Sequence, residues 1–273
     1  MSYSVITRLG HKIEFDIDKI ARAVELAYQS TSSADQYTDD ELENYHDYIR
    51  LLAELDWPAY MNGDSAFHEL VLAAYKTNGV QGVENELYKY YGALYLKTLE
   101  EQMCNSVVIN GDRLPLFHEA FLLYQLGYYY GAVAILITQL IGITADIEKY
   151  LKKNASSFDP TTIQLIHSRY GFNSTNDTSR VMTAVLEGKS LNDVQGEYNY
   201  LLGYLRCKIF RSNIPKAQRK EELSKHPNRQ YVCHGVQLNY GTKEHALKVI
   251  LCIDALTWVA EVISDNITKN NTN

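Results

Sequence analysis

The chain has 273 residues, of which 46% are hydrophobic and 22% are charged, so its composition is that of a globular protein and excludes a disordered or fibrous one. The net charge of −7 argues against a protein whose whole surface binds nucleic acid. The length fits either one large domain or two ordinary ones.

The first 110 residues are predicted to form a helical region with a short hairpin. Residues 3–7 and 11–16 are β-prone runs on either side of Leu9-Gly10, which predicts a β-hairpin. From residue 16 onward, apolar residues recur at helical spacing. They predict helices over residues 16–30, 38–57, 64–78 and 80–103, with Pro58 ending the second and Asn78-Gly79 separating the last two.

A change in composition predicts a domain boundary after residue 110. The loop 105–115 contains Asn110-Gly111-Asp112, so we divide the chain into residues 1–110 and 111–273. The second part is expected to be helical as well, which makes the fold class all-α, a helical bundle with a small N-terminal hairpin. Its predicted helices cover residues 115–127, 128–153, 160–169, 178–188, 193–212 and 243–266, the last capped by Thr242.

Residues 128–145 form an 18-residue stretch without a charge, which is long enough for a membrane helix. The stretch also contains Gly131, Thr138, Gln139 and Gly142. These residues favour a buried core helix, so we expect no membrane contact, and a peripheral membrane protein is the less favoured alternative.

The cysteines and the first residues favour a cytoplasmic protein. Cys104, Cys207, Cys233 and Cys252 have no close pairing and no metal-ligand spacing, so neither a disulfide framework nor a zinc site is indicated. The N-terminal sequence lacks the apolar core and cleavage site of a signal peptide.

Tyrosine is unusually frequent, with 22 residues against 7 phenylalanines and 2 tryptophans. Tyrosines at this density are expected mainly to pack between helices with the hydroxyl in water. A surface on which bases stack is the alternative.

Positive charge is concentrated between Arg206 and Arg229. This segment contains eight basic residues and two acids, a local balance of 8 − 2 = +6. Such a strip suits a local phosphate-binding site, and a solvated helix and loop would have the same composition. The candidate RNA-binding residues are Arg211, Lys216, Arg219, Lys220 and Lys225.

The basic strip leads into the most chemically suggestive segment, residues 226–235, which reads HPNRQYVCHG. Pro227 suits a first helical position and Gly235 a left-handed stop, so a two-turn helix is predicted. Arg229 and His234 are five positions apart in it. A guanidinium can hold a phosphate at two points and an imidazole can transfer a proton near neutral pH, so the pair could act on a phosphodiester without a metal.

Asp254 is the only charged residue between Val249 and Ala260. A buried carboxylate without a partner would cost several kcal/mol, so we expect it to be paired. Arg229 and His234 are the nearest candidates in sequence. The alternative is that a backbone amide or a tyrosine binds it.

Residues 113–266 resemble the HEPN family of all-α nucleases and nucleotide-binding domains. The resemblance is carried by Asn228-Arg229, four residues, His234-Gly235 and a following helix with an internal acid, Asp254. Upstream, residues 113–143 are similar to the helix pair that precedes the motif. Two positions depart from the family pattern: Gln230 stands where Asn, Asp or His is common, and Ile141 replaces an acidic residue.

The resemblance implies a metal-independent endoribonuclease of phage-defence or toxin–antitoxin type. It implies catalytic roles for Arg229 and His234, with Asn228, Gln230 and Asp254 in support, and it requires no metal and no cofactor. RNA would be the substrate, a two-fold homodimer the active form, and an antitoxin or regulatory protein a possible partner. A non-catalytic binding or regulatory subunit of a defence system is the alternative.

A second resemblance lies at the start of the chain. Residues 5–20 are similar to the opening hairpin and helix of the ATP-cone regulatory domain. This similarity implies nucleotide binding in that region.

Overall fold

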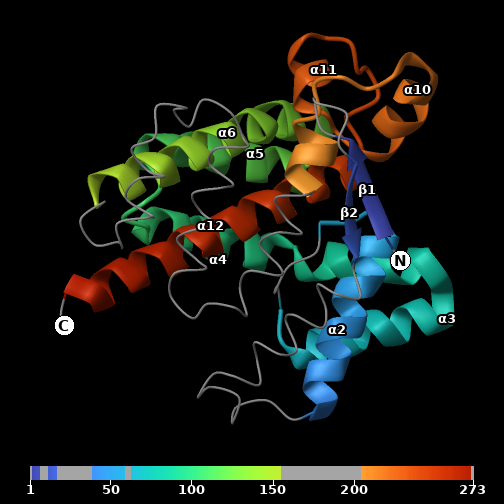
Figure 1. Ribbon diagram of the computed structural model, residues 1–273, viewed down its shortest axis with the longest axis horizontal. Helices are drawn as coiled ribbons and strands as arrows, with labels where there is room; N and C mark the ends of the chain where they lie inside the picture. The colour runs from blue at the N-terminus through green and yellow to red at the C-terminus, as the bar shows by residue number, and fades with distance from the viewer. Residues whose placement is uncertain (1, 7–11, 17–38, 59–62, 155–203, 272–273) are drawn as a thin grey trace.

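The computed structural model describes residues 2–6, 12–16, 39–58, 63–154 and 204–271, and it is built from helices around one long central helix (Figure 1). The all-α fold class is confirmed for this part of the chain. The helices are α2 (Asp39–Glu54), α3 (Ser65–Tyr90), α4 (Ala93–Asn105), α5 (Leu114–Gln125), α6 (Tyr129–Lys153), α10 (Lys216–Lys225), α11 (Arg229–Cys233) and α12 (Lys243–Asn271). Two short turns, η2 (Gly111–Arg113) and the π-helical η4 (Leu205–Ile209), complete the set.

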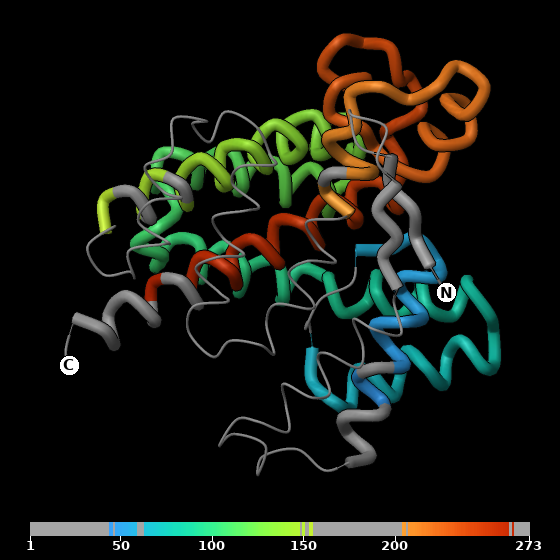
Figure 2. The backbone as a smooth tube through the Cα atoms, in the orientation of Figure 1, coloured from blue at the N-terminus to red at the C-terminus, as the bar shows by residue number. Residues whose placement is uncertain are grey.

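Helix α12 is the centre of the molecule. It packs along α6 on one side and contacts α4 on the other (Figures 1 and 2). Because it is covered from both sides, its residues 246–256 are buried all round, as an almost uniformly apolar segment requires. Thr242 caps it as predicted, since its hydroxyl accepts a hydrogen bond from the N–H of His245 at 3.0 Å.

One apolar core joins the helices on both sides of residue 110. Tyr48 and Leu99 belong to the same buried cluster as Leu140 and Ile253. The division into residues 1–110 and 111–273 stays a prediction, and in the described part the helices before and after that boundary share a core.

Helices α5 and α6 lie where the sequence predicts them. The stretch Tyr129–Ile147 of α6 is long and apolar enough to cross a membrane, and half of it is buried. The buried half includes Ile137, Leu140 and Ile143, which are fully enclosed in the core. That face of α6 packs as expected for a core helix.

The predicted separation of two helices at Asn78-Gly79 is confirmed, because Gly79 has the non-helical angles φ 59° and ψ −146° and divides α3 into two helical segments. A second interruption, at Tyr91 and Gly92, falls inside the predicted 80–103 helix and was not predicted. The new start at Ala93 rotates the buried face of α4. Leu94 is therefore 81% exposed, while Leu96 and Leu99 are buried.

Helix α2 ends at Glu54, four residues before the proline that was predicted to end it. Trp57 N–H donates to the Leu52 carbonyl at 2.9 Å and Asp56 N–H to that of Ala53 at 3.2 Å. This is a Schellman motif, whose left-handed position usually carries glycine. Here Asp56 occupies it with φ 60°, the only non-glycine residue with positive φ in the described part.

Asp254 is bound by tyrosines. The hydroxyls of Tyr91 and Tyr95 donate to its Oδ2 at 3.1 and 2.7 Å. The tyrosine alternative is thus confirmed, and the expected pairing with Arg229 or His234 is wrong, because α11 packs against α6 while Tyr91 and Tyr95 reach Asp254.

Two strands, β1 (Ser2–Ile6) and β2 (Lys12–Asp16), pair antiparallel with Val5 opposite Ile13. The predicted helices over 16–30, 160–169 and 178–188, and most of 193–212, lie outside the described residues. The hairpin as an element of the fold, and the ATP-cone resemblance with it, stay predictions.

The Tyr95→Phe variant tests how far the buried carboxylate depends on its tyrosines. The change removes the shorter hydrogen bond to Asp254 and keeps the ring. We expect the free energy of unfolding in urea to fall by about 1.5–3 kcal/mol, as for a lost bond to a charged group. Tyr75→Phe, on the exposed side of α3, is the control and should shift it by less than about 0.5 kcal/mol. Equal stabilities for the two variants would contradict this role.

Candidate functional site

Helix α11 carries the sequence motif, and local signals at both ends define it. Asn228 is its N-cap, with Oδ1 accepting from the N–H of Tyr231 at 3.3 Å. His234 is its C-cap, and Gly235 follows with φ 65°, as predicted for a left-handed stop. The predicted two-turn helix starting at Pro227 is wrong, because the capping side chain of Asn228 sets the start at Arg229.

Arg229 and His234 are accessible from the same short helix. His234 is exposed and Arg229 is partly exposed. The Nε of Arg229 is buried without a hydrogen-bond partner, and no described residue forms a hydrogen bond or ion pair with the guanidinium or with the His234 imidazole. Five residues of α-helix turn through about 140° beyond a full turn, so the two side chains leave α11 on different sides.

Two buried amide side chains fix α11 to its surroundings. Asn228 Nδ2 donates to the carbonyls of Lys208 and Arg211 at 2.9 and 3.0 Å. Gln237 accepts from the N–H of Asn228 at 2.9 Å. It donates through Nε2 to the carbonyls of Leu223 and His226 at 2.7 and 2.9 Å. Asn228, expected to support catalysis, is thus enclosed and positions the helix backbone instead.

Gln237 was missed from the sequence. It stands in the loop after α11 and carries no spacing or motif signal. Only the folded chain brings its amide against carbonyls of α10 and of the residues before α11.

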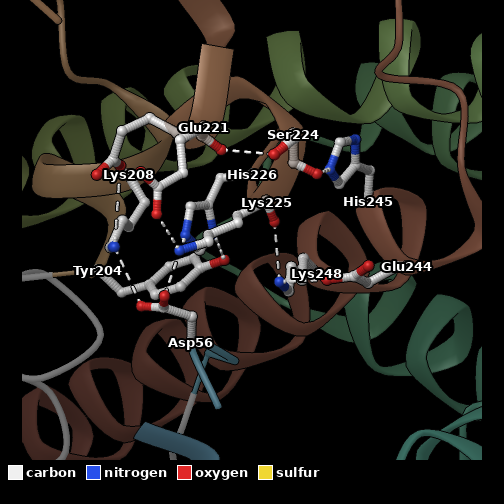
Figure 3. Close-up of polar contacts among 11 residues, drawn as sticks. Asp56, Tyr204, Lys208, Glu221, Ser224, Lys225, His226, Glu244, His245 and Lys248 are labelled. Atoms are coloured by element: carbon white, nitrogen blue, oxygen red, sulfur yellow. Dashed lines mark hydrogen bonds and ion pairs between the residues drawn. The ribbon is translucent and has the colours of Figure 1, made fainter. Parts of the chain in front are cut away.

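A charged cluster lies under this segment and draws on three separate parts of the chain (Figure 3). Lys208 Nζ lies 3.0 Å from Asp56 Oδ1 and 3.9 Å from Glu222 Oε2. His226 Nε2 is 3.9 Å from Asp56 Oδ2, beyond hydrogen-bonding distance, and its Nδ1 is 3.1 Å from the Tyr204 hydroxyl. The carboxylate of Asp56 explains why an aspartate occupies the left-handed position at the end of α2.

The environment fixes the charges in this cluster. Burial lowers the pKa of His226 to about 4, against the opposing effect of Asp56. Burial alone would raise the pKa of Asp56, but His226 and Lys208 together bring it well below its usual value. At neutral pH, Asp56 and Lys208 therefore form the ion pair and His226 is neutral.

Helix α12 supplies a second set of contacts to the same region (Figure 3). The side chain of Lys248 is 2% exposed, and its Nζ donates to Glu244 Oε1 at 2.6 Å and to the Lys225 carbonyl at 2.9 Å. Burial lowers the pKa of Lys248, with Glu244 opposing this effect. The ring nitrogens of His245 lie 3.2 Å from the carbonyls of Ser224 and Tyr240. These contacts tie the end of α10 to the start of α12.

The basic strip contains a helix, α10, that the sequence analysis did not predict. Lys216 and Lys220 are exposed on it, and Arg211 before it is partly exposed. Arg219 instead lies over the ring of Tyr231 at 5.1 Å, and Lys225 pairs with Glu221 at 2.8 Å. Of the five candidate RNA-binding residues, these two are engaged within the protein.

The remaining candidates separate into two places. Gln230 is partly exposed in α11, next to Arg229. Asp254 lies in the core between tyrosines and is not brought to α11. Within the described residues, no three His, Cys, Asp or Glu side chains are grouped so that they could hold a metal ion.

No protein-family model matches the chain, and neither a curated protein nor a solved structure is significantly similar to it. The likeness to HEPN domains therefore rests on the motif residues and the helix order given above.

The depressed pKa of His226 predicts how stability depends on pH. Unfolded chains protonate histidine near pH 6.5, whereas native His226 binds its proton only near pH 4. Between these values the unfolded state binds more protons, so the free energy of unfolding should fall as the pH falls through this window, by up to about 3 kcal/mol from this residue. Asp56 contributes only below about pH 4, because its pKa is lowered from 3.8.

Urea titrations from pH 7.5 to 4 measure this effect. His226→Gln should flatten the pH dependence relative to the wild type. The same slope in His226→Gln and the wild type would show that His226 is protonated normally in the native protein.

Proposed function

We propose that this chain is a metal-independent endoribonuclease of HEPN type that acts in phage defence or in a toxin–antitoxin pair. One observation supports it above the rest. Arg229 and His234 stand on a short helix held by buried amides, and no described side chain of the same protomer neutralises or binds either of them. The Nε of Arg229 in particular is buried without a hydrogen-bond partner, and buried polar groups in native proteins normally have one.

The chemistry follows from the two groups. The ribose 2′-oxygen forms a bond to the adjacent phosphorus while the bond from phosphorus to the 5′-oxygen breaks. The proton of the 2′-hydroxyl is removed and another is delivered to the leaving 5′-oxygen, which gives a 2′,3′-cyclic phosphate and a 5′-hydroxyl. His234 transfers a proton, and the Arg229 guanidinium stabilises the charge on the phosphoryl oxygens by a two-point contact.

A two-fold homodimer completes the proposed site. Because Arg229 and His234 leave α11 about 140° apart, a single protomer presents them poorly to one phosphate. Two copies of α11 meeting across a two-fold axis would supply two imidazoles, one as base and one as acid. Isologous dimers are also the commonest oligomers.

The exposed cations beside α11 support RNA as the substrate. Lys216, Lys220 and the partly exposed Arg211 belong to a segment with a local excess of positive charge. Such a segment attracts a polyanion even though the whole chain is acidic. A cytoplasmic protein that needs no cofactor, with an antitoxin or regulatory protein as a further partner, fits this proposal.

A second candidate is a non-catalytic binding or regulatory subunit of a defence system. Gln230 favours it, because this position next to Arg229 departs from the family pattern. In that case Arg229 would bind an anion without any reaction.

The His234→Ala variant separates the two candidates. With purified protein and total cellular RNA, we expect this change to lower the cleavage rate by a factor of about 10² to 10⁴, the usual contribution of a positioned acid or base. Arg229→Lys should also fail, since a point charge cannot reproduce a two-point contact. Wild-type products should end in a 2′,3′-cyclic phosphate, and EDTA should not change the rate.

The matched control is His118→Ala, which removes an exposed histidine on α5. It should cleave at the wild-type rate. If the wild type does not cleave RNA and Arg229→Ala only weakens ligand binding, the protein is the binding subunit instead.

A further inference from the structure

Tyr130, in the first turn of α6, is a rigidly fixed aromatic ring that is nevertheless 54% exposed. Its hydroxyl donates to the carbonyl of Leu238 at 3.0 Å. Its ring meets that of Tyr240 edge-on, with centroids 5.0 Å apart and an interplanar angle of 76°. Most exposed tyrosines lack such contacts and lose side-chain entropy when they bind a ligand. Tyr130 has already lost that freedom in the free protein.

Gly241 lies against the same ring. A β-carbon at position 241 would overlap three ring atoms of Tyr130, Cγ, Cδ1 and Cδ2. Only glycine therefore lets the backbone approach so closely. One side of the ring is supported by this backbone, and the exposed part remains open to solvent.

The ring is close to the proposed reaction site. Leu238, whose carbonyl holds Tyr130, follows His234 by four residues, which an extended chain can span in at most about 14 Å. Bases stack about 3.4 Å apart along a nucleic-acid strand. A base a few nucleotides from a phosphate at His234 can therefore reach the ring.

The surroundings favour a nucleic-acid base as the occupant. His245 connects the end of the basic helix α10 to Tyr240, because its ring lies between the carbonyls of Ser224 and Tyr240. The exposed lysines of α10, Lys216 and Lys220, would draw an RNA strand toward this part of the molecule. A flat ring beside a cationic surface is the arrangement by which proteins bind single strands.

We propose that the exposed side of Tyr130 is a stacking platform for a base of single-stranded RNA near the cleaved phosphate. The position of that phosphate rests on the proposed function, whereas the stacking itself does not require cleavage. The platform would bind any base, because every base has a π-face.

The test measures the dissociation constants of labelled single-stranded RNA 8-mers at one fixed salt concentration, in a His234→Ala background that keeps the strand intact. Tyr130→Ala should weaken binding by about 5- to 100-fold, the usual contribution of one stacked base. Tyr130→Phe keeps the ring and should bind within about threefold of the parent. Gly241→Ala should reproduce the loss by displacing the ring. Tyr75→Ala, at an exposed tyrosine on α3, is the control and should have no effect.

A series of 8-mers with one abasic position each identifies the stacked base. The parent protein should bind one or two of these strands more weakly, and Tyr130→Ala should add no further loss for those strands. The proposal is overturned if Tyr130→Ala binds like the parent, or if it loses as much affinity for every abasic strand as for the full one. It is also overturned if the variant changes the mass in light scattering, which would make this surface a contact between copies.

Cleavage by the chain with an intact His234 distinguishes this inference from the proposed function. If Tyr130→Ala loses RNA affinity in a base-dependent way but the chain cleaves no RNA, the nuclease proposal is wrong and the stacking proposal stands. If the chain cleaves RNA normally and Tyr130→Ala has no effect on binding, only the stacking proposal is wrong. Thermal unfolding of each variant confirms that it is folded.

Discussion

The position of α11 depends on two buried amide side chains that hydrogen-bond to the backbone of the neighbouring segments. Asn228 and Gln237 together bind four carbonyls and two backbone N–H groups. Each of these polar groups would cost free energy if it were buried without a partner. The segments 204–211, 223–226 and 228–237 are therefore fixed relative to one another, and the two side chains proposed for catalysis are fixed with them.

The same constraint links α11 to the first half of the chain. Asp56 stands in a backbone conformation that glycine would adopt more easily, and its carboxylate pairs with Lys208. The carbonyl of Lys208 in turn accepts from Asn228. A residue at the end of α2 thus helps to hold the motif helix. The ion pair with Lys208 offsets the unfavourable backbone conformation of Asp56. Lys248 adds an anchor from α12.

Sequence reasoning was most successful where the signal is local. Apolar periodicity located α5, α6 and α12, and side-chain chemistry identified Thr242 as a cap and Gly235 as a stop. It failed where tertiary contacts decide: at the break before α4, at the expected pairing of Asp254 with Arg229 or His234, and at Gln237 and Asp56, whose partners are distant in sequence. The motif residues could be named from the chain alone. The network that positions them could not, because hydrogen bonds between separate segments leave no periodic trace.

Amide hydrogen exchange of residues 226–237 tests most directly whether this network holds α11 in place. The N–H groups of Val232 and Asn228 should exchange far more slowly than those of exposed loops and approach the protection of the buried part of α12. Asn228→Asp keeps the capping oxygen but removes the two amide donors, so it should speed exchange throughout the segment. Exchange in the wild type as fast as in an exposed loop would show that the segment opens freely and would contradict the account.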